Sequence, residues 1–134
     1  MSVCIRLTVA CEAYAMPVEY VAEVAGLGEV RAVPGARPEL LGIQNLRGQI
    51  LPVFDLALLL GIPRTAPPSR LLVVEASGCQ AGFAVDEVSG IGDLPDPGED
   101  TGSDLLAGAT LSDGDLIGVI DVTRVIDSLD RTPP

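Results

Sequence analysis

Short apolar segments, separated by turn residues, limit the folds open to this chain more than any other feature. In residues 3–9 the apolar side chains Val, Ile, Leu and Val alternate with Cys, Arg and Thr. This period of two is that of a half-buried β-strand. About nine such segments follow one another, with turn signals roughly every 8–12 residues and no alternation of strands with long helices. The sequence therefore predicts an all-β fold, either an antiparallel sandwich or small barrels.

Turn residues indicate which strands form hairpins. We expect hairpins from residues 3–9 with 14–18, from 70–76 with 80–85, and from 109–111 with 116–122. Residues 49–54 are apolar on both faces and predict a strand that is buried on both sides. Residues 95–103, rich in Pro, Gly and acidic side chains, predict a mobile loop.

Few helices are expected, and all of them are short. Residues 56–60 follow Asp55, a good N-cap residue, and residues 123–129 place their apolar side chains on one face. Residues 38–41 begin with Pro and fit one helical turn. Residues 19–25 predict either a short helix or an irregular turn. The two halves of the chain resemble each other loosely, but their identity does not establish a repeat.

The charge of the chain argues against nucleic-acid binding. All eight cations are Arg, and nineteen acidic residues give a net charge of −11, which repels a phosphate backbone.

No apolar run approaches the ~18–20 residues of a membrane-spanning helix, and no basic segment followed by an apolar run marks the N-terminus. We expect one domain over residues 1–134, cytoplasmic and without direct membrane insertion.

The negative charge is concentrated in the second half of the chain. From Asp86 to Asp115 there are nine carboxylates and no cation. One interpretation is a solvated acidic segment that aids solubility. The other is an acidic face for a basic partner, and the sequence leaves both open.

The chain lacks the residues that most catalytic and metal-binding sites require. Without His there is neither a Ser-His-Asp triad nor a Cys-His pair, and without Lys there is no phosphate-loop cation. Cys4, Cys11 and Cys79 follow no zinc-ligand spacing and are expected to be reduced. The carboxylates between residues 96 and 104 lack the spacing of a calcium-binding loop. The sequence predicts a non-enzymatic protein without a metal or cofactor.

The most informative segment is residues 42–56, with the sequence Gly-Ile-Gln-Asn-Leu-Arg-Gly-Gln-Ile-Leu-Pro-Val-Phe-Asp-Leu. It places Arg47 beside a glycine turn, directly before the apolar strand. Gly48 permits a tight or left-handed turn, and Asn45 can hydrogen-bond that turn locally. An arginine on a rigid support is suited to bidentate contacts and is common among interface hot spots.

This segment resembles the CheW family, whose hallmark is Gly-Val-Ile-Asn-Leu-Arg-Gly followed by an apolar strand and Asp-Leu. Gln44 departs from that pattern. The resemblance extends upstream to residues 14–19, 21–24 and 33–34, and downstream to residues 83–88 and 113–126. It therefore covers residues 2–129. Relative to the family, the stretch between Asp86 and Asp121 is shorter and more acidic.

The resemblance implies two intertwined SH3-like five-stranded β-barrels with short helices, with barrel halves roughly at 15–65 and 66–120 and the terminal segments completing them. It also implies an adaptor that binds the cytoplasmic tip of a chemoreceptor and the regulatory domain of a CheA-type histidine kinase, and that is recruited to membrane receptor arrays. The positions that match the family's binding groove are Val21, Glu23, Gly42, Asn45 and Arg47.

Each of these residues also has a structural interpretation. Arg47 can brace the first barrel through Glu23, Gly42 and Gly48 can be backbone requirements, Asn45 can be a turn former, and Val21 can be core. Two other functions remain open: a CheW-like scaffold that does not activate the kinase, and a small ligand-binding or carbohydrate-processing barrel. The latter function is disfavoured, because the chain has only four aromatic side chains, too few for an aromatic binding platform, and offers no suitable general base.

Overall fold

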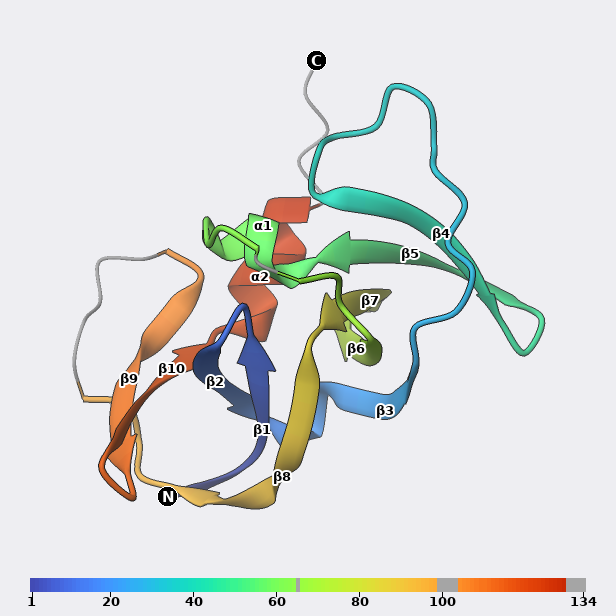
Figure 1. The fold of residues 1–134 in the computed structure, drawn as a ribbon. Helices are drawn as coiled ribbons and strands as arrows, with labels where there is room; N and C mark the ends of the chain where they lie inside the picture. Colours follow the sequence, from blue (N-terminus) through green and yellow to red (C-terminus); the bar gives the residue numbers. More distant parts are fainter. Residues whose placement is uncertain (65, 99–103, 130–134) are drawn as a thin grey trace.

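The computed structural model describes residues 1–64, 66–98 and 104–129, which form ten strands and three short helices (Figure 1). The first sheet has the order β3-β6-β7-β5-β4, with β3 at Val21–Gly26, β4 at Leu40–Leu46, β5 at Gln49–Asp55, β6 at Arg70–Ala76 and β7 at Cys79–Val85. The second has the order β8-β1-β2-β10-β9, with β1 at Ser2–Val9, β2 at Glu12–Pro17, β8 at Glu87–Leu94, β9 at Leu106–Ser112 and β10 at Asp115–Ile120. This is the expected all-β fold with two five-stranded units, consistent with SH3-like barrels.

The strands of the two sheets are interleaved along the chain. The chain leaves the second sheet after β2, builds the whole first sheet, and returns to the second at β8. Strands β6 and β7 therefore belong with β3, β4 and β5, whereas β1 and β2 pair with β8 and β10. This division differs from the expected halves at 15–65 and 66–120, because β7 pairs in parallel with β5 and ties residues 70–85 to the first sheet.

Both sheets have the same topology. A central hairpin, β6–β7 or β1–β2, lies between an edge strand, β3 or β8, and a parallel neighbour, β5 or β10. That neighbour forms a hairpin with the other edge strand, β4 or β9, and is followed by a helix: α1 at Leu56–Leu60 or α2 at Val122–Leu129. The loose resemblance between the halves thus corresponds to a duplicated arrangement of strands.

The largest apolar core lies between the two sheets. It combines buried side chains of β1 and β2, such as Leu7 and Met16, with side chains of β6 and β7, such as Leu72 and Phe83. Helix α2 contributes Val125 and Ile126 to the same cluster. Two smaller clusters lie inside the individual sheets. The shared core joins both sheets into one packed structure.

The predicted helix at residues 56–60 and its N-cap are confirmed. Asp55 caps the helix, since its Oδ1 accepts a hydrogen bond from the Ala57 backbone N at 3.0 Å. Gly61 ends the helix with a left-handed φ of 73°. The three predicted hairpins are also present, at β1–β2, β6–β7 and β9–β10.

Two helix predictions are wrong. Residues 19–25 form the end of a 3-10 turn, η1 at Val18–Tyr20, and then strand β3, whose residues alternate between half-buried and exposed. Residues 38–41 form a turn that runs into β4. In both segments strand pairing replaces the local hydrogen bonds of a helix: residues 21–26 pair with the distant strand β6, and residue 40 pairs with the neighbouring strand β5. Residues 95–98 of the predicted loop have no regular structure, and 99–103 lie outside the described residues.

Candidate functional site

Strands β4 and β5 form a hairpin that carries Arg47 at its tip. Arg47 and Gly48 are its two turn residues, and both have positive φ, at 51° and 84°, as a tight turn between twisted strands requires. The Oδ1 atom of Asn45 accepts a hydrogen bond from the Gly48 backbone N at 2.8 Å. The predicted turn-forming role of Asn45 is confirmed, and the backbone that carries Arg47 is fixed by its own hairpin.

The Arg47 guanidinium forms an ion pair with Glu23 of β3. Strands β3 and β4 are the two edges of the first sheet, so this contact shows that the sheet curls until its edges approach each other. The Arg47 side chain is 69% exposed and that of Glu23 is 31% exposed. Exposed pairs of this kind stabilise a fold by about 0–1 kcal/mol. The ion pair is therefore a weak brace that orients the guanidinium while leaving most of the side chain exposed.

Gly42 is a backbone requirement of this site. Its φ is 149°, and a Cβ at this position would lie 2.6 Å from the carbonyl carbon of Arg31 and closer still to its oxygen. That oxygen accepts a hydrogen bond from the Ile43 backbone N at 2.9 Å. Residue 31 thereby pairs with the outer edge of β4, and only glycine fits between the two backbones.

Val21 lies at the start of β3, opposite Val74 of β6, and is half-buried against the core between the sheets. The structure thus brings Glu23, Asn45 and Arg47 together around the β4–β5 hairpin. Val21 contributes to packing on the same edge strand as Glu23, and Gly42 supports the backbone of β4. Of the five predicted site residues, Arg47 and Glu23 are the two that carry charge, and both are partly exposed.

Gln44, the departure from the family motif, has a structural explanation. Its side chain is only 5% exposed, and its Oε1 accepts a hydrogen bond from the Gly28 backbone N at 3.1 Å. A buried amide is tolerated where its hydrogen bonds are made. Gln44 fastens the segment after β3 to β4, beside a depression of about 500 Å³ that Arg31, Asn45 and Ile50 also line.

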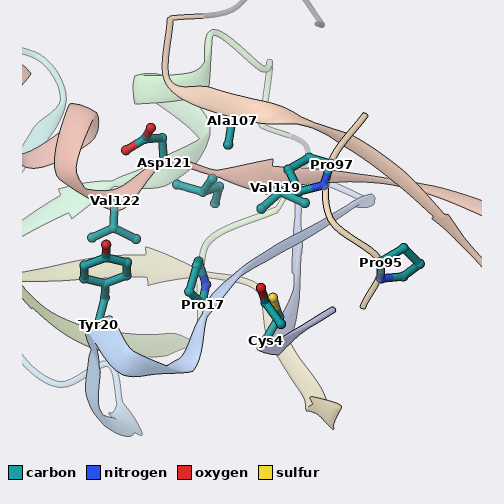
Figure 2. A pocket seen from close by; sticks show the side chains of 11 residues that line it. Cys4, Pro17, Tyr20, Pro95, Pro97, Ala107, Val119, Asp121 and Val122 are labelled. Carbon is teal, nitrogen blue, oxygen red and sulfur yellow. The ribbon is translucent and has the colours of Figure 1, made fainter. Parts of the chain in front are cut away.

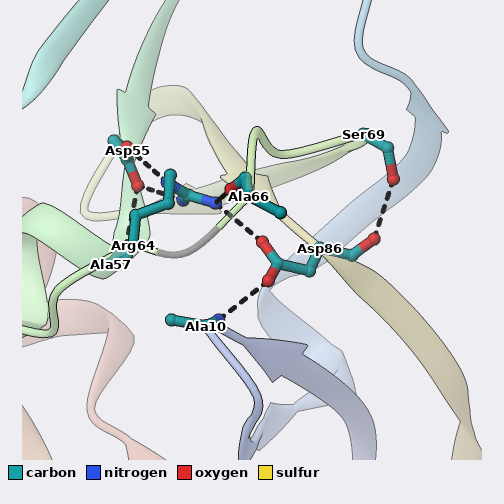
Figure 3. A network of polar contacts seen from close by, with 7 residues as sticks. All are labelled: Ala10, Asp55, Ala57, Arg64, Ala66, Ser69 and Asp86. Atoms are coloured by element: carbon teal, nitrogen blue, oxygen red, sulfur yellow. Dashed lines mark hydrogen bonds and ion pairs between the residues drawn. The ribbon is translucent and has the colours of Figure 1, made fainter.

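Sequence reasoning missed a second polar cluster, which is centred on Arg64 (Figure 3). Its guanidinium forms ion pairs with Asp55 and Asp86, with a distance of 2.7 Å from Nη1 to the Asp86 Oδ1. The other Asp86 oxygen, Oδ2, accepts a hydrogen bond from the Ala10 backbone N at 2.9 Å. These contacts connect the end of β5, the β7–β8 junction and the β1–β2 turn. Hydrogen bonding to Asp55, above all, raises the pKa of Arg64.

A cavity of about 220 Å³ lies in the second sheet (Figure 2). Pro17, Pro95 and Pro97 form much of its wall, and Cys4 and Tyr20 line it as well. Burial of the thiol, followed by the nearby Asp93 and Asp96, raises the pKa of Cys4 and keeps it protonated, which makes it a poor nucleophile. The cavity is smaller than the ~300–1,000 Å³ of typical ligand sites, so it gives little support to a ligand-binding barrel.

Residues 1–64, 66–98 and 104–129 contain no cluster of three or more potential metal ligands. None of the helices in these ranges is both long and apolar enough to cross a bilayer.

Comparison with known proteins identifies relatives over nearly the whole chain. The solved structure of the scaffolding protein TtCheW from Thermoanaerobacter tengcongensis superposes with a TM-score of 0.83 and 28% identity, covering 92% of this chain and 86% of that one. The chemotaxis protein CheW of Thermotoga maritima is 29% identical over 126 residues, which are 88% of this chain and 83% of that protein. The CheW of Rhizobium meliloti is 30% identical over 121 residues, 83% of this chain and 78% of its own.

The family model of the CheW-like domain matches residues 4–130. This range includes all of the first sheet, all but the first two residues of the second, α1, α2 and the hairpin that carries Arg47. The fold, the relatives and the family model agree, and the chain belongs to the CheW-like family of non-enzymatic chemotaxis adaptors.

Proposed function

We propose that this protein couples chemoreceptors to a CheA-type histidine kinase. It binds the cytoplasmic tip of a methyl-accepting chemoreceptor and the regulatory domain of the kinase, and it acts in the cytoplasm at membrane receptor arrays. Its membership of the CheW-like family supports the proposal, as does a solved relative that is itself named a scaffolding protein.

The observation that carries the proposal is the presentation of Arg47. A two-residue turn with an internal hydrogen bond from Gly48 to Asn45 fixes its backbone, and Glu23 orients its guanidinium. A preorganised arginine loses less conformational freedom on binding than one on a flexible tail, and its planar group offers several donors to a carboxylate or carbonyl.

The five proposed binding positions differ in their roles. Arg47 and Glu23 contact the partner through charged atoms, and Asn45 lies exposed beside them. Val21 offers a half-buried apolar surface on β3. Gly42 acts indirectly, because it allows residue 31 to pair against β4. The partner-binding surface therefore combines an edge strand with the tip of a hairpin.

A second candidate is a CheW-like scaffold that binds receptors or other CheW-like domains without activating the kinase. The connection between β8 and β9, from Leu94 to Leu106, favours it, since its described residues, 95–98 and 104–105, form neither helix nor strand. If the family uses this part of the second barrel to hold the kinase, the shortened segment weakens that contact while leaving receptor binding intact.

Calorimetry with a receptor-tip fragment and with the kinase regulatory domain tests the proposal. We expect the wild-type protein to bind both and Arg47→Ala to bind at least one about tenfold more weakly. Arg124→Ala is the matched control, because Arg124 is also an exposed arginine in an ion pair, with Asp121 at 3.4 Å. Wild-type affinity of Arg47→Ala for both partners would contradict the assigned site.

Kinase activation in a reconstituted mixture of receptor, kinase and this protein separates the two candidates. Activation supports the coupling adaptor. Receptor binding without activation supports the scaffold.

A further inference from the structure

The hairpin β9–β10 of the second sheet is the structural counterpart of the hairpin that carries Arg47. Its turn residues Asp113 and Gly114 have φ values of 53° and 83°, against 51° and 84° for Arg47 and Gly48. Each hairpin also contains an irregularity in register near its far end, next to a glycine with φ close to 150°. The two sheets therefore present equivalent hairpins.

The charges of the two tips are opposite. Where the first hairpin has Arg47, the second has Asp113, whose side chain is 89% exposed, and Asp115 follows it across the turn. The cation that reaches this tip is Arg6 of β1, whose Nη1 lies 4.0 Å from the Asp113 Oδ2. This contact is at the limit of an ion pair, so the tip keeps most of its negative potential.

The second hairpin also carries an uncovered apolar surface. Leu111 and Leu116 lie directly opposite each other on β9 and β10, and they are 66% and 65% exposed. Beside Leu116 is a depression of about 480 Å³, lined among others by Tyr14, Leu106 and Ala109. Paired exposed leucines that continue into a hollow form a contiguous apolar patch, which in a folded protein marks an interaction surface more often than scattered single leucines do.

A third carboxylate stands at the rim of this depression. Glu12 lines it, and its Oε2 accepts a hydrogen bond from the Tyr14 hydroxyl at 2.7 Å. The Tyr14 ring packs closely against Gly118 of β10: a Cβ at residue 118 would lie 3.0 Å from two ring carbons. The floor and the acidic rim are therefore held in place by side chains of β2 packed on β10.

We propose that this surface, formed by Glu12, Tyr14, Leu111, Asp113, Asp115 and Leu116, is a docking site for a basic segment of a partner protein. Aliphatic side chains of the segment cover the two leucines and the depression, and its Lys or Arg side chains face the three carboxylates. An apolar centre with a charged rim is the usual arrangement of a protein interface, and opposite charge gives it specificity. The site lies on the other sheet from Arg47 and does not depend on the function proposed above.

The test uses the full chain and two synthetic probes, a 12-residue peptide of alternating Leu and Lys and its Leu and Glu counterpart. Binding is measured by fluorescence anisotropy at about 0.15 M salt. The test variants are Asp113→Asn with Asp115→Asn, and Leu111→Ser with Leu116→Ser. Asparagine tolerates the left-handed φ of residue 113, so the turn is kept.

Matched controls come from the β1–β8 side of the same sheet. Glu87→Gln with Asp93→Asn removes the same charge, and Val3→Ser with Ile91→Ser removes two exposed apolar side chains. They are needed because a protein with a net charge of −11 attracts any cation.

We expect the Lys peptide to bind and the Glu peptide to fail, and each hairpin variant to weaken binding about tenfold while the controls change it less than about twofold. Equal losses in hairpin and control variants would overturn the proposal, because they would indicate non-specific attraction. Self-association of the wild-type chain that is lost in the leucine variant would also overturn it, because the occupant would then be a second copy.

Discussion

At the residue scale, Gly42 is required by the backbone around it, because a side chain at this position would collide with the Arg31 carbonyl. We expect Gly42→Ala to lower the free energy of unfolding by about 2–4 kcal/mol, because the new Cβ meets the Arg31 carbonyl at a φ of 149° that alanine rarely adopts. Urea unfolding followed by circular dichroism measures this change.

Gly26→Ala is the control for that measurement. Gly26 ends β3, and no heavy atom lies within 4 Å of the position that its Cβ would take. Its replacement should change the unfolding free energy by less than about 0.5 kcal/mol. A Gly42→Ala protein as stable as Gly26→Ala would mean that residue 31 can leave β4 without cost.

The cysteines offer a second test at this scale. Cys11 is exposed in the β1–β2 turn, whereas Cys4 is buried and burial raises its thiol pKa. Because the thiolate is the reactive form, iodoacetamide at pH 8 should modify Cys11 well before Cys4 in the folded protein. Peptide mass spectrometry at successive times measures the order, and urea should remove the difference. Equal rates in the folded protein would contradict the burial of Cys4.

At the scale of elements, the Arg64 cluster connects three places that are distant in sequence: the β1–β2 turn, the end of β5 and the β7–β8 junction. The Arg64 side chain is 16% exposed and that of Asp55 is 6% exposed. Removal of one partner from a largely buried pair leaves the other charge without compensation, so Arg64→Ala should lower the unfolding free energy by about 3–5 kcal/mol. Arg64→Lys should recover part of this loss, because lysine keeps the charge but cannot reach both carboxylates with a planar group.

Arg37→Ala serves as the control for the Arg64 variants, since Arg37 pairs with Glu39 at 2.9 Å in a more exposed position. We expect it to change stability by less than about 1 kcal/mol. Chemical denaturation of the four proteins under identical conditions gives the comparison. Similar losses for Arg37→Ala and Arg64→Ala would show that the Arg64 cluster is not a special junction.

The elements that could be predicted from the sequence are those with local signals. Asp55 and Gly61 bound α1, Asn45 fixes the Arg47 turn, and alternation marks β1. Strand β3 was not predictable, because its spacing of Val and Ala also suits one turn of helix and its partner β6 lies more than 40 residues away. The same holds for Arg64, whose two acidic partners are 9 and 22 residues distant and meet it only after the sheets assemble.

For the whole molecule, the assignment of strands to sheets depends on contacts that the sequence does not display. The parallel pairs β5–β7 and β2–β10 each join segments from different parts of the chain, and each has only two or three paired residues. Together with the antiparallel pairs β3–β6 and β1–β8, they place residues 70–85 in the first sheet and β1 and β2 in the second. Strands β8, β9 and β10, which carry Glu87, Asp93 and Asp115, therefore fall on the second sheet, and part of the charge asymmetry of the sequence becomes a difference between two equivalent hairpins.

The interleaved strands and the shared core imply that the two sheets unfold together, as one domain. To test this, a tryptophan can be placed at exposed apolar positions, Val24→Trp in the first sheet and Val3→Trp in the second, since the chain has no native Trp. We expect both reporters to give the same urea midpoint and slope as the backbone signal, because the main cluster takes its buried side chains from both sheets. Two separate transitions would show that each sheet is stable alone, and that the core between them contributes less than its composition indicates.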